Sequence, residues 1–200
     1  MTKSETVWQF ILESALNERQ NRFTQQDLAL RLGYSLSTVN HAVASPTQIG
    51  ALRKSGRYFT LENFSKLLYF WASWRHLHRD IIYSTYSSEP ILEREGLLPP
   101  QAVLAAYGAA RHWLIEPPAD YDQLYFYLAP EQESEARHRY PPADKKLPAN
   151  VIVLKKAAYF AANIDYTGLP LTFVDIWNLS DWYARDFTLA LEVKINALLS

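Results

Sequence analysis

A run of polar and cationic side chains in the first third of the chain has the residue types that read DNA. Short Ser, Thr, Asn and His side chains suit the base edges and phosphates of a major groove, and cations neutralise the phosphates beside it. Asn is the residue type that pairs with adenine. The predicted DNA contacts are Ser35, Ser37, Thr38, Asn40, His41, Arg53, Lys54 and Arg57.

Two helices separated by a tight turn are predicted to position the polar groups. Thr24 is an N-cap with Asp27 three residues later, and Gly33 ends the first helix. Ser35 caps the second helix, and we expect Pro46 to prevent its continuation. The spacing of three and four places the apolar side chains of the second helix inward, and these are Leu36, Val39 and Val43.

A basic hairpin is predicted after the second helix. Ser55-Gly56 is a turn dipeptide between short β-prone flanks within residues 52–60, and it lies next to the three cations. Apolar residues within 6–18 recur at helical spacing and predict one more helix before the others. This order of elements is typical of a winged helix-turn-helix domain, which we expect to span residues 1–62.

The next segment, residues 63–80, has the strongest helical pattern in the chain. Its apolar side chains recur every three or four positions, which predicts one long linking helix. Trp71 and Trp74 are expected to share a face that is either core or a dimer seam, and the high aromatic content favours the seam. The connector that follows, irregular or extended, is predicted to end at residue 90.

Residues 91–200 predict a small α/β domain, so that the fold class of the whole chain is α+β. Pro-Pro pairs and polar stretches separate its expected elements. These are a helix at 101–113, a strand at 124–128, a polar loop with a helical turn at 130–148, a strand at 151–154, an extended or helix-entry segment at 171–177 and a helix at 181–199.

Charge divides the chain into two halves. Residues 1–80 contain ten Lys or Arg and six Asp or Glu, whereas residues 81–200 contain ten and fifteen. Phosphates attract the first half and repel the second.

The absence of cysteine excludes disulfides and thiolate sites. No apolar run reaches the ~20 residues that span a bilayer, so a cytoplasmic protein without a membrane partner is expected.

Two sparse patterns are candidates for a catalytic or metal site. Asp120 and Asp122, after Tyr107-Gly108-Ala109, resemble the paired carboxylates of nucleotidyltransferases, but no third carboxylate follows. His76 and His78 are two positions apart on the predicted helix, so they point to different faces. We therefore predict no catalytic residue, metal or cofactor.

Four segments carry a resemblance to a known family, and they are 67–77, 80–86, 174–179 and 182–187. The chain resembles the AbiEi-type antitoxins of type IV toxin–antitoxin systems. The resemblance implies an N-terminal winged helix that binds the promoter of its own operon, and a C-terminal α/β domain that supports repression and neutralises a nucleotidyltransferase toxin. It implies that DNA is held by Ser37, Asn40, His41, Arg53, Lys54 and Arg57. The polar loop at 130–148 departs from the family pattern.

The sequence therefore predicts a sequence-specific DNA-binding transcriptional regulator, acting as a homodimer on double-stranded DNA. An autorepressing antitoxin is one form of this prediction. The alternatives are a protein-interaction antitoxin that neutralises a nucleotidyltransferase toxin, and a degenerate nucleotidyltransferase.

Overall fold

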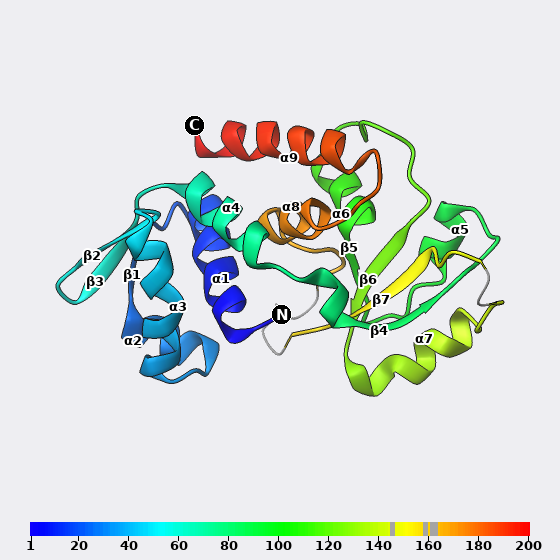
Figure 1. Cartoon of the computed structure of the whole chain (residues 1–200), viewed down its shortest axis with the longest axis horizontal. Coiled ribbons are helices and arrows are strands. Elements are labelled where there is room, and N and C mark those ends of the chain that lie inside the picture. Colours follow the sequence, from blue (N-terminus) through cyan, green and yellow to red (C-terminus); the bar gives the residue numbers. More distant parts are fainter. Residues whose placement is uncertain (145–146, 158–159, 161–163) are drawn as a thin grey trace. The chain divides into compact units, whose positions relative to one another are not determined.

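The computed structural model describes residues 1–144, 147–157, 160 and 164–200. Helices and two separate sheets make up an α+β protein, as the sequence predicts (Figure 1). The chain divides into two compact units, Met1–Arg75 with Ala197–Ser200, and His76–Asn196. The sequence pattern predicts divisions after residues 62 and 90 instead.

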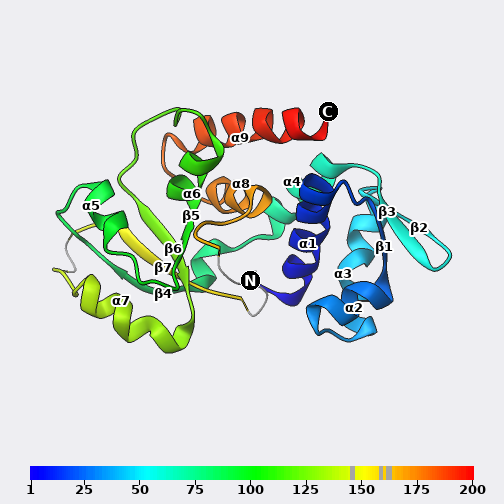
Figure 2. The same cartoon turned by 180° about the vertical axis from the view of Figure 1, so that it is seen from behind.

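The first unit contains four helices and a small antiparallel sheet in the strand order β1-β3-β2. Its elements are α1 (Lys3–Glu18), β1 (Arg22–Thr24), α2 (Gln25–Leu32), α3 (Leu36–Gln48), β2 (Leu52–Ser55), β3 (Tyr58–Leu61) and α4 (Phe64–Trp74). Figure 2 shows α1, α2 and α3 packed together, with the β2–β3 hairpin projecting from the unit. Phe23 and Phe59 stack across β1 and β3 with ring centroids 5.8 Å apart, and both rings are buried.

The predicted helix caps of the first unit are confirmed. The Thr24 side chain accepts a hydrogen bond of 3.0 Å from the Asp27 backbone, and Gly33 ends α2 with a φ of 65°. Ser35 caps α3 by accepting from the Thr38 backbone at 3.1 Å. The turn between α2 and α3 therefore follows from local sequence alone.

The expectation that Pro46 ends the second helix is wrong. Helix α3 continues through Pro46 to Gln48, because an indole from α1 supplies the hydrogen bond that proline cannot donate. The predicted hairpin is confirmed, since β2 and β3 pair antiparallel, and its turn consists of Gly56 and Arg57, one residue later than the Ser-Gly pair. Gly56 has a φ of 58° at the first central position, where a type II′ turn needs glycine.

The long helix expected at 63–80 is also wrong, because α4 ends at Trp74. Arg75 leaves the helix with a ψ of 130°, and its buried guanidinium lies 3.4 Å from Glu5 Oε1. Trp71 is fully buried and its indole donates to Glu5 Oε1 at 3.3 Å, while Trp74 is 60% exposed. The two tryptophans therefore do not form one surface.

The second unit is built on a four-stranded mixed sheet in the order β4-β7-β6-β5. The β6–β7 pair is parallel, and the other pairs are antiparallel. The elements are the 3₁₀ helix η1 (Leu77–Asp80), β4 (Ile81–Thr85), α5 (Ile91–Gly96), β5 (Val103–Ala105), α6 (Ala106–Trp113), β6 (Leu124–Leu128), the 3₁₀ helix η2 (Pro130–Gln132), α7 (Glu133–Arg139), β7 (Val151–Lys155), α8 (Leu169–Trp177) and α9 (Ala184–Leu199).

The strands predicted at 124–128 and 151–154 are confirmed, and α6 and α8 lie on one side of the sheet with α7 on the other (Figures 1 and 2). The predicted helix at 101–113 begins only at Ala106, because Val103–Ala105 pairs with β6. The segment 171–177 belongs to α8. The residues 81–85, expected in a connector, form the edge strand β4.

No helix in the described part of the chain has both the length and the apolar content needed to cross a membrane.

Candidate nucleic-acid interface

One face of α3 is exposed along its length. Ser37, Asn40, His41 and Ala44 are all exposed, at intervals of three, one and three residues, which places them on one side of a helix. The opposite side is buried in the unit through Val39, Ala42 and Val43. Three of the predicted contacts therefore share a surface. Ala44 lies on the same surface and was not predicted, although its helical spacing from Asn40 and His41 indicates that position.

Two other predicted contacts hold the start of the helix. The Ser35 hydroxyl accepts from the Thr38 backbone at 3.1 Å and lies 2.9 Å from the Thr38 hydroxyl. Thr38 is half-buried. Ser35 and Thr38 thus fix the geometry of the first turn of α3, and their hydroxyls are already hydrogen-bonded to each other.

Asn40 is held by a residue that sequence analysis did not select. Gln25 Nε2 donates a hydrogen bond of 3.1 Å to Asn40 Oδ1. Gln25 is the first residue of α2, directly after the N-cap Thr24. No motif relates positions 25 and 40, because the contact depends on how α2 and α3 cross.

The three predicted cations of the hairpin are not equivalent. Arg53 forms an ion pair of 3.0 Å with Glu62, although its side chain is 72% exposed. Side chains alternate along a strand, so Arg53 and Lys54 point to opposite faces of the sheet. Lys54 is paired in register with the buried Phe59, on the face that the helices cover, and Arg57 occupies the turn.

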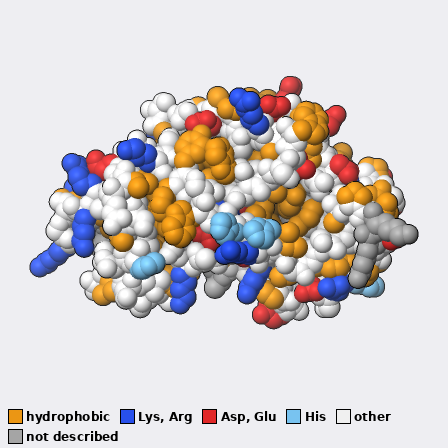
Figure 3. Space-filling view, in the orientation of Figure 1, with side chains coloured by type: hydrophobic (Ala, Val, Ile, Leu, Met, Phe, Trp, Pro, Cys, Tyr) orange, Lys and Arg blue, Asp and Glu red, His pale blue; other side chains and the backbone are white. Residues whose placement is uncertain are grey.

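A cavity of about 360 Å³ lies between the hairpin and the first turns of α2 and α3. Its lining residues are Thr24, Gln25, Gln26, Leu36, Lys54, Gly56, Arg57, Tyr58 and Phe59. Lys and Arg side chains gather over the hairpin in Figure 3. Lys54 and Arg57 thus border a recess beside α3, while Arg53 does not.

The second unit uses one of its two paired carboxylates for structure. Arg94 is fully buried and binds the Asp122 carboxylate, and it donates to the Asp122 carbonyl at 2.7 Å. Asn150 Nδ2 donates to Asp122 Oδ2 at 3.1 Å, while Asp120 is exposed. Both oxygens of the Asp122 carboxylate therefore have protein partners. Within the described ranges, no group of three or more His, Asp or Glu side chains is arranged to hold a metal ion.

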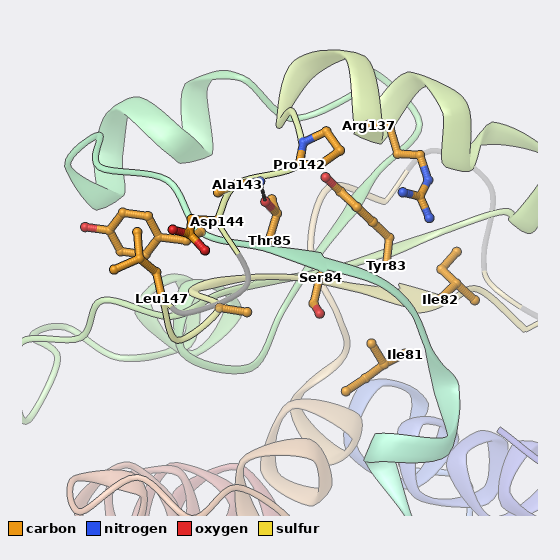
Figure 4. Close-up of a pocket in the computed structure, with 12 residues that line it drawn as sticks. Ile81, Ile82, Tyr83, Ser84, Thr85, Arg137, Pro142, Ala143, Asp144 and Leu147 are labelled. Carbon is orange, nitrogen blue, oxygen red and sulfur yellow. Dashed lines mark hydrogen bonds between the residues drawn. The ribbon is translucent and has the colours of Figure 1, made fainter.

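A cavity of about 590 Å³ runs along the edge strand β4 (Figure 4). Its polar groups hold the surrounding loop in place. The Tyr83 hydroxyl donates to the Tyr140 carbonyl at 2.7 Å, and Thr85 Oγ1 accepts from the Ala143 backbone at 3.0 Å, the bond dashed in Figure 4. Arg137 lies over the Tyr83 ring at 4.2 Å.

A cluster of tyrosines surrounds Asp181 in the second unit. The buried Tyr107 hydroxyl donates to Asp181 Oδ2 at 2.8 Å. Burial raises the pKa of Tyr107 far above its ordinary value, and it raises the pKa of Tyr183 to about 12. The Tyr107 phenol is therefore a neutral hydrogen-bond donor at neutral pH.

No protein-family model matches the chain, and neither a curated protein nor a solved structure does. Function is therefore inferred from the residues themselves and from the geometry that the fold gives them.

Proposed function

We propose that the protein is a sequence-specific DNA-binding transcriptional regulator whose first unit is a winged helix-turn-helix. The observation that carries this proposal is the exposed face of α3 beside a recess bordered by Lys54 and Arg57. The element order from α1 to β3, with a three-stranded sheet that ends in the hairpin, supports it. In this proposal α3 enters the major groove and the hairpin lies on the sugar-phosphate backbone.

The exposed face of α3 has the chemistry that base recognition needs. Ser37, Asn40 and His41 project hydrogen-bonding groups, and the methyl side chain of Ala44 allows the helix to approach closely and to contact a thymine methyl group. The N-terminus of α3 adds a partial positive charge. Base contacts specify the site, and phosphate contacts position the helix.

The cationic side chains of the hairpin are proposed to contact the DNA backbone. Lys54 and Arg57 are exposed and border the recess, so they are placed to neutralise phosphates. The acidic second unit, whose net charge repels phosphate, is assigned no contact with DNA. In this proposal it supplies the dimer contact or senses a partner.

A binding assay at several salt concentrations tests the proposal. Duplex DNA from upstream of the protein's own gene and an unrelated duplex are titrated with the full chain, with fluorescence anisotropy as the readout. We expect tighter binding to the upstream duplex, and an affinity for both that falls steeply as salt increases. Failure to bind any duplex, including a randomised pool at low salt, would exclude the proposed function.

A further inference from the structure

The hydrogen bond between Gln25 and Asn40 constrains what the asparagine can offer to a base. A free asparagine pairs with adenine through both ends of its amide, since Oδ1 accepts from N6 and Nδ2 donates to N7. In this protein Oδ1 already accepts from Gln25 Nε2 at 3.1 Å. The oxygen of the Asn40 amide therefore faces Gln25 at the start of α2, with one of its two lone pairs engaged, and both Nδ2 hydrogens remain for other partners.

The residue that holds Asn40 is itself well placed. Gln25 follows the N-cap Thr24, whose side-chain bond to the Asp27 backbone fixes the start of α2. Gln25 is half-buried and lines the recess beside the hairpin, whereas Asn40 is exposed on the recognition face of α3. The hydrogen bond is exposed, and it joins a side chain at the capped start of α2 to the one that is proposed to contact a base.

We infer that Gln25 is a specificity-determining residue, because it makes Asn40 a donor toward DNA. This inference rests on the proposed function and deepens it. The Nδ2 group then favours base edges that accept, which are O6 and N7 of guanine and O4 of thymine, whereas adenine offers only N7 beside its N6 donor. Adenine read through both amide ends, and cytosine, which offers the N4 donor, are disfavoured at the position that Asn40 contacts.

Replacing Gln25 with glutamate reverses the hydrogen bond. A carboxylate cannot donate to Oδ1, but it accepts from Nδ2, so in Gln25→Glu the amide of Asn40 turns and presents Oδ1 to the groove. Base edges that donate, N6 of adenine and N4 of cytosine, then become the better partners. The matched control is Gln26→Glu, which adds the same charge at the next residue, one that lines the same recess and is exposed.

The experiment selects binding sites from a randomised duplex pool with the full chain, followed by affinity measurements on the selected sites. We expect the wild type to prefer guanine or thymine at one position, and Gln25→Glu to shift that preference toward adenine or cytosine by about tenfold. Gln26→Glu weakens binding to all sites alike and retains the wild-type preference. Asn40→Ala removes the preference at that position in both the wild-type and the Gln25→Glu backgrounds.

The outcomes separate the two proposals. A wild type that binds no duplex overturns the proposed function, and this inference with it. A wild type that binds selectively, while Gln25→Glu retains the same base preference as Gln26→Glu, overturns this inference alone. A wild-type preference for adenine that is lost in Asn40→Ala also overturns it, since pairing through both amide ends requires Oδ1 to face the base and not Gln25 alone.

Discussion

The indole nitrogen of Trp8 donates a hydrogen bond of 2.8 Å to the carbonyl oxygen of Ala42, in the middle of α3. In a regular helix this carbonyl would accept from the backbone N–H of residue 46, but Pro46 has none. The indole takes the place of the missing donor, and the buried carbonyl keeps a partner. Helix α1 thereby fixes the helix that carries the proposed recognition face.

This relationship predicts a coupling between two substitutions. Trp8→Phe removes the indole donor, so we expect it to lower the free energy of unfolding by about 1–3 kcal/mol beyond the loss of ring area. Adding Pro46→Ala restores a backbone donor, and the double variant should recover most of that cost. Urea unfolding of the four proteins in the cycle measures both effects. Equal costs for Trp8→Phe with and without Pro46→Ala would show that the indole bond does not replace the missing N–H.

The cations of the hairpin should differ in their effect on DNA affinity. We expect Lys54→Ala and Arg57→Ala each to reduce the slope of log affinity against log salt by about 0.9, because each removes one proposed phosphate contact. Arg53→Ala is the internal comparison. Its ion pair with Glu62 already occupies the guanidinium, so its slope should stay near the wild-type value. A loss for Arg53→Ala as large as that for Arg57→Ala would contradict this assignment.

Removing the acidic partner of Arg53 should have the opposite effect. Glu62→Gln releases the Arg53 guanidinium on the exposed hairpin. We therefore expect the slope of log affinity against log salt to become steeper by up to about 0.9. Glu18→Gln removes an equal charge from the exposed end of α1 and serves as the control. In the Arg53→Ala background, Glu62→Gln should act no differently from Glu18→Gln. Anisotropy titrations at several salt concentrations provide the comparison.

The two neighbouring carboxylates of the second unit should respond differently to substitution. Asp122→Ala leaves the buried Arg94 without its charge partner, and we expect a loss of about 2 kcal/mol in unfolding free energy, between the values for exposed and buried pairs. Asp120→Ala, at an exposed position, should change stability by less than about 0.5 kcal/mol. Thermal and urea unfolding of both variants decide the matter, and similar losses would refute the structural role of Asp122.

High pH should destabilise the protein through its buried tyrosines. Folding raises the pKa values of Tyr107, Tyr121, Tyr125 and Tyr140 well above their ordinary value, and that of Tyr183 to about 12, mainly through burial. A raised pKa in the folded state gives stability that is complete below the unfolded pKa near 10 and is lost as pH rises. We expect a stable plateau up to about pH 10 and a decline above it. Absorbance at 295 nm follows phenolate formation, and full ionisation of all tyrosines before unfolding would contradict the prediction.

Local signals predicted much of the fold. The caps at Thr24 and Ser35 and the stop at Gly33 are encoded within a few residues, so they could be read directly. Strand 103–105 was missed because its partner in β6 lies about twenty residues away. Helix α8 is buried on nearly every side, its polar Thr172 and Asp175 included, so its sequence has no one-sided helical pattern to detect.

In the candidate site too, local features could be predicted from the sequence and contacts between separate elements could not. Its exposed face on α3 follows from the spacing of Ser37, Asn40 and His41, and was predicted in the main. The pairing of Arg53 with Glu62, and the hold of Gln25 on Asn40, depend on how separate elements meet, so no pattern along the chain reveals them. The continuation of α3 through Pro46 also depends on a contact between separate elements, because the indole donor, Trp8, lies in another helix.

The pairing of β4 has a consequence for synthesis on the ribosome. The helices α1–α4 and the sheet of the first unit lie within the first 75 residues of the chain. In contrast, β4 pairs with β7, which lies about seventy residues further along the chain. At about 5–20 residues per second, β4 waits roughly 4–14 s for its neighbour. A chain that stalls before Val151 would thus display the uncharged strand Ile81–Thr85 unpaired, as a template for a strand of another molecule.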